Sequence, residues 1–216
     1  MSLLKKIKSK IKLNLFLSSL NSLYRNYFEV RRSKFGFICK TAKVRYPILI
    51  KGIENVYLHD NTHILGYSKL ITTKAKFTMK KNSGSAEGLT IITGTHPQVI
   101  GEFFMEGASK DHQIAKDILV EEDVWLGTNV TLLAGVKIGR GSIIGSGSVC
   151  RNSVPPYAIA TGNPAKVVGF KFSPKEVIIH ESLLYPENER LSSEYLQKNY
   201  EQYFLNKIKE IKNYIN

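Results

Sequence analysis

Residues 120–155 decide the fold, because they divide into six consecutive hexapeptides: VEEDVW, LGTNVT, LLAGVK, IGRGSI, IGSGSV and CRNSVP. An aliphatic or small apolar residue opens each block: Val120, Leu126, Leu132, Ile138, Ile144 and Cys150. The fifth place of each block is small or β-branched: Val124, Val130, Val136, Ser142, Ser148 and Val154. A period of six fits neither an amphipathic helix nor an alternating strand, whereas it is typical of a parallel β-helix. We therefore predict a triangular prism in which each block forms one short strand, three blocks close one coil, and the opening residues point inward.

The six-residue frame extends toward the N-terminus, but less regularly. Two blocks keep it at residues 58–69 and, after a slip, three more keep it at residues 79–96. Residues 97–119 break the period, and an interruption of this length inside a repeat is usually a functional loop. We therefore expect a prism at residues 46–172 with a protruding loop at residues 97–119.

The segment after the repeats has helical patterns. Residues 173–176 (SPKE) combine an N-cap serine, a proline at the first helical position and a glutamate at the third, which is the pattern of a capping box. Apolar and aromatic residues then recur at helical spacing over residues 191–216, which indicates a packed helix. We expect C-terminal helices at residues 173–216.

The net charge of +13 is concentrated at the start of the chain, where residues 1–45 hold twelve Lys and Arg against one acid, Glu29. We expect this segment to be a basic helical appendage, with one apolar face made of Leu3, Leu4, Ile7, Ile11 and Leu15. Two interpretations of that face stay open: residues 1–15 dock on an anionic membrane surface, or they pack on the prism or on a neighbouring subunit. Nucleic-acid binding is not expected, because the lysines lack interleaved aromatic residues until Tyr24.

Several features indicate a cytoplasmic protein, with the inner face of the membrane as the place for any peripheral contact. No run approaches the 18 apolar residues of a transmembrane helix. The stretch LNLFLSSL after the basic start is short, contains Asn14 and lacks a small-residue cleavage site, unlike a secretory signal. Cys39 and Cys150 make no disulfide framework, and Cys150 opens a block as a small core residue.

Three motifs resemble the left-handed β-helix acyltransferases, the hexapeptide-repeat family that includes galactoside, maltose and xenobiotic O-acetyltransferases. They are GTHP at residues 94–97, VEEDVWLGTNVTLLAGVKIG at residues 120–139 and VPPYAIATGNPAKVVG at residues 154–169, within a resemblance that covers roughly residues 53–172. It implies a left-handed coil, acetyl-CoA as the co-substrate, and a homotrimer with acetyl-CoA in a groove between adjacent subunits.

Acyl transfer to a hydroxyl needs a base, because a hydroxyl is a poor nucleophile at neutral pH. Of the five histidines, His96 is the leading candidate, since a rigid coil would aim its side chain while the loop covers it; His112, within the loop, is second. The resemblance implies the same residue, because the family's catalytic histidine occupies this setting before the loop. Which group orients the ring stays open among Glu102, Glu106 and Asp111.

The resemblance also implies a set of residues that contact acetyl-CoA. They are Trp125 and Thr128 near the thioester, Ser146 along the pantetheine arm, Arg151 and Asn152 beyond it, and Lys166 near the adenosine phosphates. The backbone N–H of Thr128 would be a donor to the oxyanion. An alternative stays open for three of them: Thr128 and Ser146 as plain corner residues, and Trp125 as a packing residue.

The acceptor is less well determined. Galactoside-type members bind the sugar through polar residues upstream of the catalytic histidine, and here Gly66 and Lys74 stand where an Asn and an Asp are expected. This departure argues against a galactoside or maltose acceptor. We expect acetylation of a saccharide hydroxyl, in a unit of a capsule or lipopolysaccharide, with acetylation of an antibiotic as the alternative.

Two further functions have less support in the sequence. A carbonic anhydrase on a similar prism binds zinc through three histidines of neighbouring coils; residues 120–155 contain no histidine, so no metal site is expected. A prism that serves only as a scaffold would bind no CoA.

Overall fold

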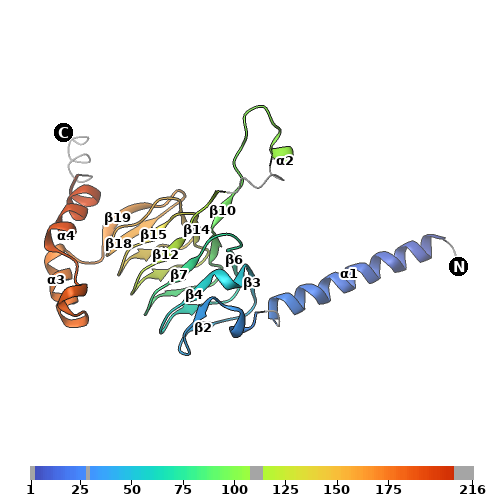
Figure 1. Cartoon of the computed structure of the whole chain (residues 1–216), viewed down its shortest axis with the longest axis horizontal. Helices are drawn as coiled ribbons and strands as arrows, with labels where there is room; N and C mark the ends of the chain where they lie inside the picture. Colours follow the sequence, from blue (N-terminus) through green and yellow to red (C-terminus); the bar gives the residue numbers. More distant parts are fainter. Residues whose placement is uncertain (1–2, 28–29, 108–113, 207–216) are drawn as a thin grey trace.

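The structure is a computed structural model that describes residues 3–27, 30–107 and 114–206. Its centre is a prism whose three faces are parallel sheets (Figure 1). Sheet A orders β1 (Phe37–Ile38), β4 (Val56–Leu58), β7 (Phe77–Met79), β12 (Ile118–Val120) and β15 (Lys137–Ile138). Sheet B orders β2 (Lys43–Val44), β5 (His63–Ile64), β8 (Gly84–Ser85), β13 (Trp125–Leu126), β16 (Ile143–Ile144) and β18 (Ala158–Thr161), with β19 (Lys166–Phe170) antiparallel at its edge. Sheet C orders β3 (Ile48–Lys51), β6 (Ser68–Ile71), β9 (Thr90–Ile92), β14 (Thr131–Leu133) and β17 (Val149–Cys150).

The interior of the prism confirms the hexapeptide pattern. All six opening residues of residues 120–155 are 0% exposed, and the fifth-place residues are at most 5% exposed. In the earlier coils the openers Leu58, Ile64 and Met79 and the fifth-place Ser83 and Leu89 are buried too. Buried hydroxyls find backbone partners: Ser142 Oγ donates to the Pro155 carbonyl at 2.8 Å and Ser148 Oγ to the Gly145 carbonyl at 2.6 Å. Polar fifth places are therefore compatible with the core.

The corners explain why glycine and asparagine recur. The fourth place of five consecutive blocks has a positive φ, at Asp123 (57°), Asn129 (57°), Gly135 (84°), Gly141 (70°) and Gly147 (72°). Glycine, asparagine and aspartate are the residues that adopt this left-handed conformation most readily. Glycine in second place has a different cause: a Cβ at Gly127 would lie 2.7 Å from the Ser146 nitrogen of the next coil.

The prism begins earlier than the sequence suggests, and this corrects the predicted boundary at residue 46. Strand β1 pairs with β4 and β2 pairs with β5, so the coils start at Phe37. Ala42 and Ile48 fill interior positions at 2% and 1% exposure. The six-residue frame is present in this coil as well, because Ile38, Val44 and Ile50 pair with the interior residues Leu58, Ile64 and Leu70 of the next coil.

The helical appendage is α1 (Leu3–Tyr27), which projects away from the first coil (Figure 1). A short 3₁₀ turn at Arg32–Lys34 leads from it toward the prism. The side chains of residues 3–11 lie outside the description, so of the predicted apolar face only Leu15 is described, and it is 62% exposed. In the described part of the chain, no helix is both long and apolar enough to cross a membrane.

The loop both begins and ends earlier than predicted, because it leaves the prism at Gly94 instead of residue 97 and rejoins it at Ile118. Strands β10 (Gly94–Thr95) and β11 (Ile114–Ala115) pair antiparallel and form the stem of a hairpin. The chain is back in sheet A at Ile118, which pairs with Phe77 and is 0% exposed. The predicted end at residue 119 was therefore wrong by two residues, because Ile118 already occupies an interior fifth place. The loop carries one helical turn, α2 (Phe104–Gly107).

The C-terminal helices cover the opposite end of the prism from α1 (Figure 1). Helix α3 (Pro174–Leu184) starts with the predicted capping box: Ser173 Oγ accepts from the Glu176 N–H, and the Glu176 side chain accepts from the Ser173 N–H. A 3₁₀ turn (Glu187–Glu189) leads to α4 (Ser193–Tyr200), which continues as a π-helical turn (Glu201–Leu205). Leu196 and Val177 pack with Tyr157 in a small second core.

Candidate functional site

His96 directly follows Thr95, the last residue of β10, at the root of the hairpin. Its side chain is exposed. The antiparallel pair Thr95–Ile114 fixes the point at which the chain leaves the prism. Of the groups predicted to orient the ring, Glu102 is half-buried, the side chain of Glu106 is not described, and Asp111 lies outside the described residues, as does His112.

A hollow of about 610 Å³ lies beside the hairpin stem. Gly94 and Thr95 line one side, and Ala134 and Arg151 from the following coils line another. Arg151 comes directly after β17 and is exposed. The structure therefore brings the segment that precedes His96 and one predicted cation to the same hollow.

Trp125 lies on a different face. It belongs to β13 of sheet B, is 49% exposed, and lines a second hollow of about 310 Å³. The two hollows share no lining residue. Within one chain, the predicted site residues are thus distributed over two faces of the prism.

Thr128 and Ser146 meet at the corner between sheets B and C. The Thr128 N–H donates to Ser146 Oγ over 3.2 Å, and both residues are exposed. The amide predicted as an oxyanion donor is thus already engaged by a neighbouring hydroxyl in this structure. Asn152, after β17, and Lys166, at the start of β19, are both exposed.

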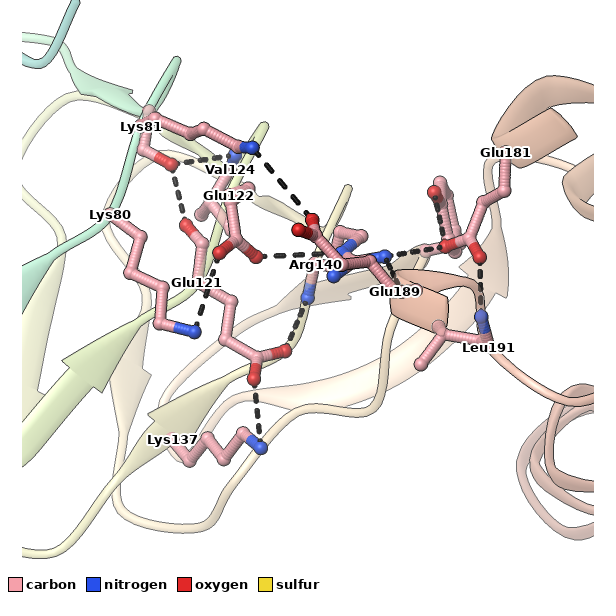
Figure 2. A network of polar contacts seen from close by, with 12 residues as sticks. Lys80, Lys81, Glu121, Glu122, Val124, Lys137, Arg140, Glu181, Glu189 and Leu191 are labelled. Carbon is pink, nitrogen blue, oxygen red and sulfur yellow. Dashed lines mark hydrogen bonds and ion pairs between the residues drawn. The ribbon is translucent and has the colours of Figure 1, made fainter. Parts of the chain in front are cut away.

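A network of charged groups that the sequence did not indicate joins the prism to the C-terminal helices (Figure 2). Arg140 donates to Glu122 (3.4 Å), to Glu181 (3.2 Å) and to the Glu189 carbonyl (2.9 Å), and its guanidinium stacks on Tyr185 at 4.1 Å. Glu181 is 1% exposed and also accepts from the Tyr157 hydroxyl at 2.9 Å. Burial, and then the Glu181 carboxylate, raise the pKa of the Tyr157 phenol. Because every one of these charges has a partner, we assign the network a structural role.

Burial of Glu122 on its own would raise the pKa of that carboxyl. A backbone hydrogen bond and the nearby Lys80 and Arg140 outweigh burial, so the pKa falls below the ordinary value of 4.5. The pairing with Lys80 is direct, at 3.3 Å. As for metals, the described residues contain no group of three or more His, Cys, Asp or Glu side chains that could hold an ion.

Comparison with known proteins supports the fold assignment. Residues 117–152 match the family model described as bacterial transferase hexapeptide (six repeats). No curated protein sequence matches the chain. Among solved structures, a hexapeptide-repeat acetyltransferase of Vibrio cholerae, complexed with acetyl coenzyme A, has a TM-score of 0.61 at 24% identity, covering 70% of this chain and 84% of that one.

Two further structures are similar to the same extent. A maltose O-acetyltransferase from Clostridium difficile has a TM-score of 0.60 at 23% identity, covering 74% of this chain and 87% of that one. A galactoside acetyltransferase in complex with coenzyme A has a TM-score of 0.61 at 18% identity, covering 82% of this chain and 87% of that one. The chain therefore contains the hexapeptide repeat at residues 117–152. It has the left-handed parallel β-helix of these acetyltransferases, with a protruding loop and helices at both ends.

Proposed function

We propose that this protein is an acetyl-CoA-dependent O-acetyltransferase that modifies a hydroxyl of a saccharide. The observation that carries the proposal is the position of His96 at the root of a hairpin on a hexapeptide prism, directly after Thr95, which lines a hollow together with Arg151. The V. cholerae structure was solved with acetyl coenzyme A, and two other similar proteins are named for maltose and galactoside.

His96 acts in this proposal as the general base. Its imidazole takes the proton of the acceptor hydroxyl while that oxygen attacks the thioester carbonyl. The oxyanion then collapses, the C–S bond breaks, and the imidazolium returns its proton to the departing CoA sulfur. The products are an acetyl ester and CoA with a free thiol, and His96 is neutral again.

Acetyl-CoA is assigned to the residues that the resemblance implies. Arg151 and Lys166 are exposed cations suited to phosphate groups, and Trp125, Ser146 and Asn152 would follow the rest of the molecule. For Thr128 to stabilise the oxyanion, its N–H must exchange the Ser146 hydroxyl for the substrate oxygen.

We further propose a homotrimer with one site between each pair of subunits. The distribution of His96 and Trp125 over different faces supports this, because a neighbouring copy could bring the Trp125 face of one chain to the His96 face of the next. The loop supports it too: Ile100 (102%), Phe103 (80%) and Met105 (80%) are almost fully exposed apolar residues that a neighbour could cover.

For the appendage we propose a contact with an anionic membrane, which would bring a cytoplasmic enzyme to a lipid-linked polysaccharide unit. The described half of α1 has exposed apolar residues at helical spacing: Leu13, Phe16, Leu17, Leu20, Leu23 and Tyr24. Residues 3–27 contain five lysines, one arginine and no acid. This charge is complementary to anionic lipid and would repel a second copy of the same helix. In this proposal residues 1–15 make the contact, with the five lysines of residues 5–12 and the apolar face of Leu3, Leu4, Ile7, Ile11 and Leu15, and the exposed apolar residues of 13–24 add further apolar surface.

The experiment that tests the proposed function is acetyl-CoA turnover, followed as free thiol, across a panel of monosaccharides, oligosaccharides and antibiotics. We expect turnover with a saccharide. Turnover with an antibiotic alone would favour the xenobiotic alternative, and absence of both turnover and CoA binding would favour a scaffold.

A further inference from the structure

The second half of α1, residues 13–24, contains no charged residue. Its polar positions are serines and asparagines: Asn14, Ser18, Ser19, Asn21 and Ser22. Six of its large apolar or aromatic side chains are each 45–59% exposed: Leu13, Phe16, Leu17, Leu20, Leu23 and Tyr24. All five lysines of the helix precede this segment, within residues 5–12. The helix therefore divides into a basic half and an uncharged amphipathic half.

The six side chains share one face of the helix. At 3.6 residues per turn they fall within an arc of about 120°, whereas the serines, the asparagines and Leu15 lie outside it. The arc is wider than the narrow seam of a coiled coil. The Ser18 and Ser19 hydroxyls donate to the Leu15 carbonyl of the same helix, at 2.8 and 2.9 Å. The polar side is thus an uncharged, solvated surface, and the apolar side is left exposed.

A bilayer suits this apolar face better than a second copy of the helix does. Residues 3–27 carry six basic groups and no acid, so two copies side by side would repel each other and would have no opposite charges to pair. Anionic headgroups, by contrast, attract the lysines that precede the face. A helix with an apolar face of this kind lies in the membrane interface, with its apolar side chains among the acyl chains.

The absence of charge on the polar side determines which bilayers suit residues 13–24. A basic polar side is attracted to any anionic surface, whereas serine and asparagine side chains gain nothing from lipid charge. Binding of this half therefore depends on whether the apolar side chains, above all the aromatic ring of Phe16, find room between the lipids. Strongly curved membranes and membranes rich in unsaturated chains offer such gaps, so binding of this half depends on curvature and lipid composition.

The connection between α1 and the prism is short, so insertion would hold the protein close to the lipid. Two residues separate Tyr27, the last of α1, from Val30, and the two Cα atoms are at most about 11 Å apart. Val30 is 9% exposed, and its carbonyl accepts from the Tyr46 hydroxyl at 2.9 Å, which ties it to the first coil. Helix α1 leaves this end of the prism, while the C-terminal helices cover the other (Figure 1). The first coil would therefore face the membrane.

We propose that residues 13–24 sense lipid packing: they insert into bilayers with loosely packed headgroups, independently of lipid charge. The inference rests on the membrane contact in the proposed function and adds the selectivity of that contact. The lysines of residues 5–12 respond to anionic lipid, whereas residues 13–24 respond to packing. The protein therefore binds most tightly where both conditions hold, and an acceptor attached to lipid would be modified preferentially there.

Sedimentation of the full-length protein with phosphatidylcholine vesicles tests this inference. Small and large vesicles, of dioleoyl or dimyristoyl lipid in the fluid state, are compared at high salt, which screens the lysines. We expect small dioleoyl vesicles to bind about tenfold more tightly than large dimyristoyl ones. Phe16→Ala and Leu20→Ala should each remove most of this preference. Ser18→Ala, on the polar side of the same helix, is the matched control and should keep the preference.

A charged polar side should reverse the selectivity. Ser18→Lys combined with Ser22→Lys adds two cations opposite the apolar arc. This variant should bind large vesicles that contain phosphatidylglycerol more tightly than the wild type at low salt, and it should discriminate less between small and large vesicles. Unchanged discrimination in this variant would contradict the role assigned to the uncharged side.

The remaining outcomes separate the inference from the proposed function. Binding that high salt abolishes, or that is equal for every vesicle size and chain type, would overturn the inference and leave the anionic contact standing. Absence of binding to every vesicle would overturn both. Light scattering in which Phe16→Ala lowers the particle mass, without an effect on vesicle binding, would show that copies of the helix cover this face, and would overturn the inference. Packing-dependent binding without thiol release from acetyl-CoA contradicts the proposed acetyl transfer alone.

Discussion

The last two full coils of the prism and the hairpin loop inserted before them follow opposite rules. In β12–β17 every opening residue is fully buried, and the same residue types stack from coil to coil. In the loop, Ile100, Phe103 and Met105 are at least 80% exposed, yet the residue proposed as the base lies at its root. The repeating coils thus provide a rigid support, whereas the loop that interrupts them positions the proposed reactive group.

The largest expected difference between the two regions is the loss of stability when a large apolar side chain is replaced by alanine. Leu132→Ala deletes a side chain that is 0% exposed and should lower the free energy of unfolding by about 2–5 kcal/mol. Ile100→Ala, at 102% exposure in the single chain, should change the free energy of unfolding of the dissociated subunit by less than about 0.5 kcal/mol. Urea unfolding followed by circular dichroism measures both values. If both variants lost the same free energy of unfolding, the loop would have to be packed as tightly as the coils. The contrast between the two regions would then be wrong.

The C-terminal helices are a second region outside the repeat, and charged contacts join them to the coils. Glu181→Gln keeps the volume of a residue that is 1% exposed but removes the charge that Arg140 and the Tyr157 hydroxyl contact. We expect a loss of about 1–3 kcal/mol in the same unfolding measurement, as for hydrogen bonds to charged groups. Glu187→Gln, on the exposed turn that follows α3, is the control and should have almost no effect. A neutral Glu181→Gln variant would show that the network is dispensable.

Low pH should also weaken the contacts between the coils and the C-terminal helices, by less than the Glu181→Gln substitution does. The pKa of Glu122 is lowered in the folded protein, so its contribution to stability is complete above the ordinary value of 4.5 and is lost as the pH falls through the folded pKa. Unfolding measured at pH 7, 5, 4 and 3 should show the wild type losing more stability below pH 4.5 than Glu122→Gln. Parallel curves for the two proteins would contradict the assignment.

The two cysteines give the smallest effect, a difference in reactivity without a change in stability. Burial raises the pKa of the Cys150 thiol to about 11, and Cys150 is 0% exposed, whereas Cys39 is half-buried. Since the thiolate is the reactive form, a thiol reagent at pH 7.5 should label Cys39 first, as mass spectrometry of Cys39→Ser and Cys150→Ser variants can establish. Faster labelling of Cys150 would mean that the last coil opens.

The regular coils could be predicted because each position of the hexapeptide has one structural environment. The opening position points into the prism, and it is apolar in all six blocks from Val120 to Cys150. The capping box at Ser173 was equally local and was also confirmed. The first coil was missed because its blocks lack the second-place glycine of the later repeats, although Ile38, Val44 and Ile50 keep the six-residue spacing. The Arg140–Glu181 network joins residues 41 positions apart, and no local pattern indicates such a contact. The hollow that Trp125 lines was missed for the same reason, since His63, Gly84 and Trp125 meet there only through strand register.

The most direct test of the central claim is the rate of acetyl transfer by His96→Ala at saturating acetyl-CoA and acceptor. The account predicts a loss of about 100-fold or more, the usual contribution of a positioned general base, with acetyl-CoA affinity nearly unchanged. His59→Ala, which removes an exposed histidine on another face, should retain the wild-type rate. A His96→Ala variant that keeps most of its activity, while His112→Ala loses it, would contradict the assignment of the base to His96.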